Sequence, residues 1–127
     1  MSSSTTFAGV MREVPIVPLP CTILTVVRGM VVQRDPSSPA VVPWLSGSNF
    51  PIGVCTGNAD HDLLQVDVYC GKGASVQILC AAGIVPAPGD LLYFSATLGS
   101  VTNVASGAAV AKAIATGIDG YVEAVLI

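Results

Sequence analysis

The chain is short and strongly apolar, with 127 residues of which 52% are hydrophobic and 10% charged, against about 25% charged in typical domains. This composition excludes an intrinsically disordered chain, because such chains are poor in apolar residues and rich in charge. The formal net charge of −3 and five singly scattered basic residues argue against a nucleic-acid partner, since no cluster could neutralise several phosphates together.

The small number of charged groups also predicts that the protein assembles. The length accommodates one domain, and five basic and eight acidic residues are few for the surface of a folded monomer of this size. We therefore expect much of the outside to be buried against copies of the same chain or against another partner.

The first twenty residues are rich in proline around the motif VPIVPLP. Pro15, Pro18 and Pro20 confine the preceding residues to extended geometry and cannot donate hydrogen bonds inside a sheet. The segment is either an edge strand leading into the fold or an arm laid across a neighbouring subunit. We predict an extended N-terminal arm over residues 1–20 and a β-barrel domain over residues 21–127, so that removing the arm leaves a folded domain. The candidate partner-contact side chains of the arm are aliphatic: Val14, Ile16, Val17 and Leu19.

Nothing in the sequence indicates a membrane span or a signal peptide. The longest apolar stretch, Val14 to Val27, is shorter than the roughly 20 residues that cross a bilayer and contains three prolines. The start of the chain lacks a basic region followed by an apolar core. We therefore expect a protein made and kept in the cytosol, with no membrane partner.

Glycine and proline interrupt the rest of the chain so often that helices have little room, and valine, the commonest residue, favours strands. Short segments bounded by turn signals predict an all-β fold, a compact small β-barrel or sandwich. Outside the arm and the central segment, the expected strands are Thr22–Val27, Met30–Gln33, Ala40–Leu45, Ile52–Cys55, Asp90–Ser95, Ser100–Val104, Val110–Ala115 and Tyr121–Ile127.

The central segment, Leu63 to Ala81, shows the clearest alternation of apolar and polar residues. It predicts a β-hairpin around Gly71-Lys72-Gly73, because a three-residue loop with glycine is a standard hairpin connection. In this register Val68 lies opposite Val76, and Leu64 lies opposite Cys80.

The four cysteines, at positions 21, 55, 70 and 80, contain no C-x₂-C pair of the kind that begins a zinc site. In the predicted hairpin Cys70 and Cys80 are separated by roughly 20 Å, too far for a disulfide. We predict four reduced thiols that pack as small hydrophobic side chains, and no metal or cofactor.

The single histidine, His61, lies in the polar segment Asn58–Asp62. A histidine between carboxylates could form a catalytic pair, but the sequence has no G-x-S-x-G nucleophile motif to partner it. The same segment does not match a calcium loop, because Leu63 replaces the required glycine and Tyr69 the final glutamate. We therefore interpret it as a solvated loop and expect no enzyme activity.

Five segments, taken in order, carry a resemblance to a known family. They are VVRGMVVQRD, PIGVCTG, LLQVDVYCGKGASVQILC, PAPGDLLYFSATLGSVTN and AVAKAIATGIDGYVEAVLI. In this order and spacing the chain resembles, from about Cys21 to Ile127, the small capsid decoration (cement) proteins of tailed bacteriophages. The specific points are an early strand that begins with glycine at Arg28–Val31, the segment Ile52–Val54, the turn and strand Pro88–Phe94, and the terminal Asp119–Glu123.

The resemblance implies a structural protein of the virion without chemistry of its own. Such proteins form a compact β-barrel, typically trimerise, and bind the outside of an icosahedral shell, where they clamp neighbouring capsomers. The implied partners are the chain itself, as a homotrimer, and the major capsid protein; the implied location is the capsid exterior after synthesis in the host cytoplasm. The alternative from the residues alone is a small cytosolic β-barrel module that binds an unidentified ligand, which predicts a stable monomer with a lined cavity.

Overall fold

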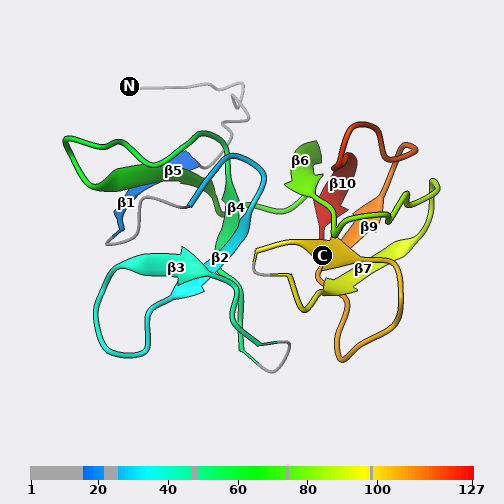
Figure 1. The fold of residues 1–127 in the computed structure, drawn as a ribbon, viewed down its shortest axis with the longest axis horizontal. Coiled ribbons are helices and arrows are strands. Elements are labelled where there is room, and N and C mark those ends of the chain that lie inside the picture. The colour runs from blue at the N-terminus through cyan, green and yellow to red at the C-terminus, as the bar shows by residue number, and fades with distance from the viewer. Residues whose placement is uncertain (1–15, 22–25, 47–48, 74, 98) are drawn as a thin grey trace, which may run out of the picture.

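The computed structural model describes residues 16–127 except 22–25, 47–48, 74 and 98. These residues form an all-β fold, as the sequence predicts, with two antiparallel five-stranded sheets that lie side by side (Figure 1). The first sheet has the strand order β1-β5-β4-β2-β3 and the second β6-β10-β9-β7-β8. We call residues 16–72 the first lobe and residues 75–127 the second lobe. The strands are β1 (Ile16–Pro20), β2 (Val31–Arg34), β3 (Val41–Pro43), β4 (Gly53–Cys55), β5 (Gln65–Tyr69), β6 (Ser75–Leu79), β7 (Leu91–Phe94), β8 (Val101–Thr102), β9 (Ala111–Ala113) and β10 (Tyr121–Leu126).

The predicted central hairpin is wrong, although both of its strands exist. β5 pairs with β1 and β4 in the first sheet, whereas β6 pairs with β10 in the second. Residues 70–73 therefore connect the two lobes instead of turning a hairpin (Figure 1). Alternation shows which side chains of a strand are buried but not which strand lies beside it. Of the expected strand Thr22–Val27, residues 22–25 lie outside the described residues, and Val26 and Val27 are not in a strand.

Residues 16–20 of the predicted arm are β1, the edge strand of the first sheet, and they pair with β5 along their whole length. Prolines are tolerated because of the direction in which their nitrogens point. Cys21 N–H donates to the carbonyl of Leu64 on the β5 side (2.9 Å). By alternation the backbone N–H of Leu19 also points toward β5, whereas the nitrogens of Pro18 and Pro20 point to the open edge of the sheet, where no hydrogen bond is lost. This part of the chain thus belongs to the first lobe; residues 1–15, including Val14, lie outside the described residues.

Each lobe has its own apolar core, built from inward-facing side chains of its sheet. The core of the first lobe consists of Cys21, Val26, Val32, Val41, Cys55, Val66 and Val68. The core of the second lobe contains Ile78, Cys80, Leu92, Val101, Ala111, Ala113, Val122 and Ala124, and three first-lobe residues join it: Val31, Trp44 and Val54.

The two lobes are structural repeats of one another. Strands β6 to β10 have the same order in their sheet as β1 to β5. Each sheet also curls until its two edges meet, because Cys21 bridges Val41 in parallel and Cys80 bridges Val101 in the same way. Strand β1 therefore corresponds to β6, β2 to β7, and so on to β10.

The backbone hydrogen bonds repeat as well. Gly29 N–H donates to the carbonyl of Cys55 (2.8 Å), and Gly89 N–H donates to that of Ala113 (2.8 Å). Both glycines have a left-handed backbone, with φ of 90° and 92°. Since Gly29 and Gly89 occupy the same place before β2 and β7, the correspondence extends to the turns.

The two lobes pack on each other through apolar side chains, one aromatic pair and backbone hydrogen bonds, which together we call the interlobe contact. The rings of Trp44 and Phe94 meet edge to face, with centroids 5.1 Å apart. Two backbone hydrogen bonds of 2.8 Å cross between the lobes: Val31 N–H donates to the carbonyl of Gly99, and Leu79 N–H donates to that of Gly29. The apolar, aromatic and backbone parts of this contact fix one lobe on the other.

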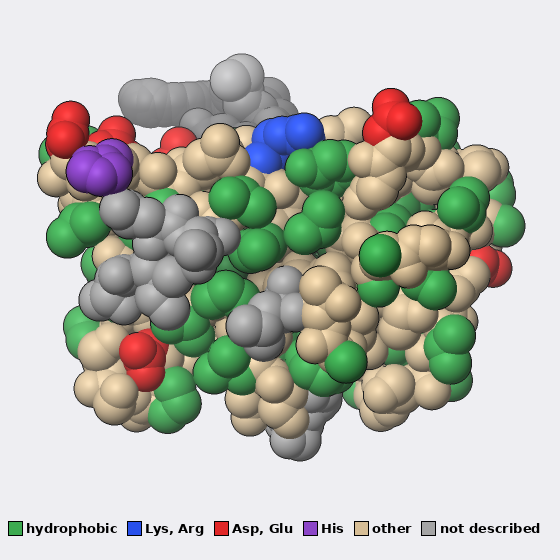
Figure 2. All heavy atoms as spheres, in the orientation of Figure 1, with side chains coloured by type: hydrophobic (Ala, Val, Ile, Leu, Met, Phe, Trp, Pro, Cys, Tyr) green, Lys and Arg blue, Asp and Glu red, His purple; other side chains and the backbone are tan. Residues whose placement is uncertain are grey.

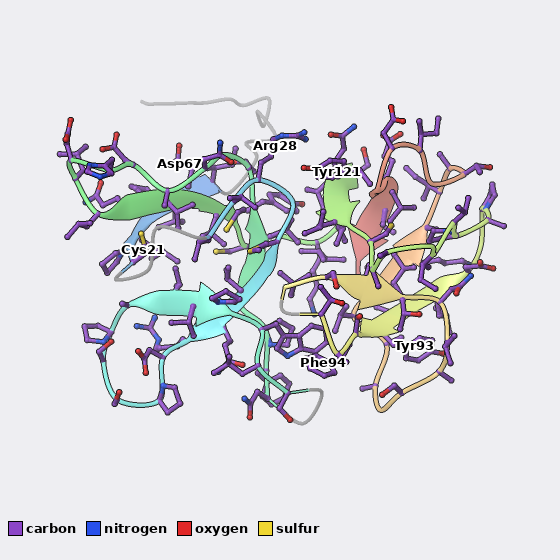
Figure 3. All side chains as sticks on the ribbon, viewed as in Figure 1. Cys21, Arg28, Asp67, Tyr93, Phe94 and Tyr121 are labelled. Carbon is purple, nitrogen blue, oxygen red and sulfur yellow. The ribbon has the colours of Figure 1, made fainter. Side chains whose placement is uncertain are left out.

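Arg28 adds a polar part to the interlobe contact. Its guanidinium lies 4.5 Å from the centre of the Tyr121 ring, and its Nη1 donates to Oε1 of Gln77 at 2.7 Å. Figure 3 shows Arg28 and Tyr121 approaching each other from the two lobes.

We expect Gly29→Ala to destabilise the fold more than Gly89→Ala. Both changes place a side chain on a left-handed backbone, at a cost of about 1–2 kcal/mol. At Gly29 the new Cβ would also lie 2.7 Å from Cε1 of Tyr121, whereas nothing lies within 4 Å of it at Gly89. Urea unfolding of the two variants measures the difference, which should be about 1 kcal/mol or more. Equal losses would contradict the described packing of Tyr121.

Candidate functional site

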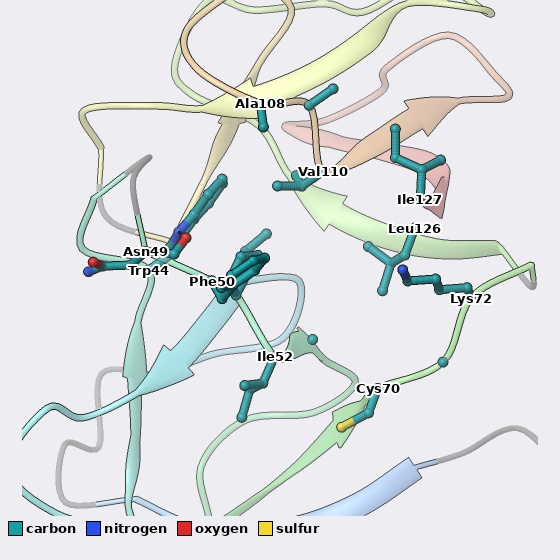
Figure 4. A pocket seen from close by; sticks show the side chains of 15 residues that line it. Trp44, Asn49, Phe50, Ile52, Cys70, Lys72, Ala108, Val110, Leu126 and Ile127 are labelled. Carbon is teal, nitrogen blue, oxygen red and sulfur yellow. Dashed lines mark hydrogen bonds between the residues drawn. The ribbon is translucent and has the colours of Figure 1, made fainter.

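An apolar groove of about 340 Å³ lies where the two lobes meet. In Figure 4 Trp44 and Phe50 lie on one side of the groove, with Leu126 and Lys72 opposite them. The lining residues are Val31, Trp44, Asn49, Phe50, Pro51, Ile52, Gly53, Cys70, Gly71, Lys72, Ala108, Ala109, Val110, Leu126 and Ile127. Lys72 is the one ionisable amine among them, so the groove suits an apolar occupant better than an anion.

A buried glutamine positions one wall of the groove. Gln33 is 3% exposed, and its Oε1 accepts hydrogen bonds from Leu45 N–H (2.9 Å) and Asn49 Nδ2 (3.0 Å). Trp44 Nε1 in turn donates to the carbonyl of Asn49 at 3.1 Å. These bonds hold Asn49 beside Trp44 and Gln33. The next residue, Phe50, is 93% exposed.

The polar segment around His61 is exposed to solvent. His61 Nδ1 lies 3.8 Å from Asp62 Oδ1, and the two side chains are 85% and 97% exposed. Asp60 Oδ1 accepts hydrogen bonds from the backbone N–H groups of Leu63 and Asp62, and these lower the pKa of its carboxyl group. A carboxylate that caps its own turn and a solvated histidine match the predicted solvated loop.

The four cysteines are free, as predicted, and three of them are buried. Burial raises the pKa of the Cys55 thiol to about 12, and the neighbouring Cys21 adds to the effect. Cys70 is exposed at the groove, and its pKa is raised by partial burial.

We expect one cysteine to react quickly in the native protein and four in the denatured protein. Only a thiolate that the reagent can reach attacks it, so the three buried thiols react slowly, whereas Cys70 is exposed. Titration with a coloured thiol reagent, with and without denaturant, measures both counts. Cys70→Ser should abolish the fast reaction and leave three thiols after denaturation; a second fast thiol in the native protein would contradict the burial of Cys21, Cys55 and Cys80.

Among the residues that the structure describes, no three His, Cys, Asp or Glu side chains lie together as metal ligands would. The same residues include no helix with the length and hydropathy needed to cross a membrane.

Large hydrophobic side chains are exposed on both lobes. Figure 2 shows hydrophobic side chains of all sizes spread over one face of the molecule, with few charged groups between them. Of the predicted partner-contact residues, Ile16 and Val17 are exposed, while Leu19 is half-buried against the first core. The exposed set comprises Ile16, Val17, Leu45, Phe50, Leu63, Leu64, Val85, Leu91, Val104, Ile114, Ile118 and Ile127.

The groove and most of this exposed set were not found from the sequence. Phe50 and Leu91 carry no local signal, because an exposed apolar residue in a turn or strand looks the same as a buried one. Comparison with known proteins adds no relative: no protein-family model matches the sequence, and no curated protein is significantly similar to it.

Proposed function

We propose that this protein is a structural component of a phage virion, which attaches as a homotrimer to the outer surface of an icosahedral capsid and clamps neighbouring capsomers. The observation that carries the proposal is the set of exposed hydrophobic side chains on both lobes. The order of sequence segments that resembles capsid decoration proteins supports the same function.

An exposed apolar surface of this kind is stabilised when a partner buries it. The isolated chain exposes 6664 Å² and carries thirteen charged residues. A stable protein–protein interface buries roughly 800 Å² on each partner, and apolar area contributes about 25 cal/mol per Å² removed from water. A protein that holds a shell together needs buried area and symmetry rather than reactive groups, and this surface offers apolar area.

The proposal is tested by binding the protein to purified empty shells that lack it, prepared from a tailed phage whose genome encodes it. We expect saturable co-sedimentation with the shells and a rise in the temperature at which they disrupt. Binding should persist at 1 M salt, because salt screens exposed charge pairs far more than apolar contacts. Folded protein that stays in the supernatant at saturating concentration would contradict the proposal.

The groove favours a second candidate, a module that binds a small apolar ligand. Its volume of about 340 Å³ lies at the lower end of the range for ligand pockets. Replacing Ala109, which lines the groove, with tryptophan would fill it. If ligand binding is the function, Ala109→Trp should abolish ligand-dependent stabilisation; if shell binding is the function and uses other surfaces, the variant should still co-sediment.

A further inference from the structure

The first lobe uses one of its surfaces in the interlobe contact. Because the second lobe repeats the first, it has a corresponding surface, and that surface is exposed. Val31 and Val54 of the first lobe are buried against the second lobe. By strand register, Leu91 corresponds to Val31 and Lys112 to Val54, since each pair is matched across the equivalent strands. Leu91 is 42% exposed, and Lys112 is exposed.

Two more positions extend this surface. Val104 follows β8 as Trp44 follows β3, and it is 64% exposed where Trp44 is 1% exposed. The space beside Gly29 is filled by Tyr121, whereas the space beside Gly89 is open. We call Gly89, Leu91, Val104 and Lys112 the free face of the second lobe.

The other side of the interlobe contact also has a counterpart that is free. The second lobe receives the first lobe on Gln77, Leu79, Tyr121 and Gly99. The residues in the same places on the first lobe are exposed, and we call them the receiving face: Pro18, Pro20, Gln65 and Pro39.

We propose that copies of this protein associate head to tail, with the free face of one second lobe packed on the receiving face of the next first lobe. The free face continues a contact that the chain already makes within itself, and the occupant it fits is therefore a second copy. Such a contact is heterologous, and it forms a ring where the rotation closes. In a trimer, the ring would consist of six similar lobes. The inference rests on the self-association in the proposed function but not on attachment to a shell.

The contact between copies differs from the interlobe contact in ways that weaken it. Pro20 stands in the place of Leu79 and has no N–H, so the hydrogen bond from Leu79 to Gly29 cannot be repeated. The carbonyl of Pro39, which stands in the place of Gly99, already accepts a hydrogen bond from Arg34 Nη1 (3.0 Å), so a bond from Leu91 would have to share that acceptor. Lys112 replaces a buried valine and must keep its amine at the rim. The association should therefore depend on concentration, whereas the interlobe contact does not.

The first test compares Leu91→Asp with Ile118→Asp by sedimentation across a concentration series. Leu91→Asp places a carboxylate in the free face and should weaken association on the order of a hundredfold. Ile118 is 69% exposed and corresponds to Asp60, so Ile118→Asp should fold and associate like the parent chain. Circular dichroism verifies that both variants are folded. Unchanged association of folded Leu91→Asp would overturn the proposal.

The second test mixes two defective copies. Pro18→Asp spoils the receiving face and Leu91→Asp spoils the free face, so each variant alone should associate far more weakly than the parent chain. Mixed together, they retain one good face each and should form a 1:1 complex that goes no further. A Pro18→Asp chain that associates normally, or a mixture that stays monomeric, would overturn head-to-tail packing.

Neither test uses a shell, so the two proposals can fail separately. A 1:1 complex of the mixed variants together with no shell binding by the parent chain would reject the capsid function alone. Shell binding by a parent chain that is monomeric at all concentrations would reject the head-to-tail contact and the homotrimer, but not attachment to the shell.

Discussion

Replacing Trp44 with alanine should lower the free energy of unfolding by about 3–5 kcal/mol, the usual cost of removing a large buried aromatic side chain. Trp44 is 1% exposed, and its ring packs edge to face against Phe94. It is a first-lobe residue in the second-lobe core, so the cavity opens where the two lobes join. Since small domains are stable by only about 5–15 kcal/mol, this loss is a large part of the total.

Urea unfolding followed by circular dichroism measures the effect. Trp44→Phe keeps an aromatic ring beside Phe94 but removes the Nε1 hydrogen bond to Asn49, and it should cost less. Phe50→Ala is the matched control on the same segment, because its side chain is 93% exposed and the change should be within about 0.5 kcal/mol. If Trp44→Ala costs no more than Phe50→Ala, the interlobe contact is not as described.

Local patterns in the sequence were sufficient to predict most of the strands. Val66 and Val68 alternate with exposed Gln65 and Asp67, which shows that β5 has one buried face. Glycine and proline mark where strands end, because they fix backbone geometry regardless of the distant fold. The all-β class and most strand positions therefore follow from local residues.

The pairing of the strands, and the repeat of the first lobe in the second, could not be predicted in the same way. The repeat preserves strand order, register and backbone hydrogen bonds rather than residue identity: Val68 corresponds to Ala124, and Cys55 to Ala113. Smaller side chains in the second core leave space that Trp44 helps to fill. The groove is likewise invisible in the sequence, because it is formed by segments from both lobes.

Removal of residues 1–20 should disrupt the first lobe, whereas removal of residues 1–15 should leave it folded. The sequence alone suggests that the first twenty residues are dispensable for folding, but the pairing of β1 with β5 leads to a different expectation. Loss of β1 uncovers Val66 and Val68, which are 2% and 0% exposed, and removes Leu19 from the core. Each buried aliphatic side chain contributes about 1.5–3 kcal/mol, so the loss is on the order of 5 kcal/mol.

Comparing the two truncations separates the role of β1 from that of the residues before it. Thermal unfolding followed by circular dichroism should give a cooperative transition for the chain that begins at Ile16 and a weakened or absent one for the chain that begins at Cys21. If the chain that begins at Ile16 folds but self-associates more weakly than the full chain, the contact role predicted for the arm belongs to residues 1–15. Cooperative, fully stable folding without β1 would instead show that Ile16–Pro20 adds no stability, despite its five paired positions beside β5. Because β1 also carries Pro18 and Pro20 of the receiving face, a folded chain without it should fail to associate head to tail.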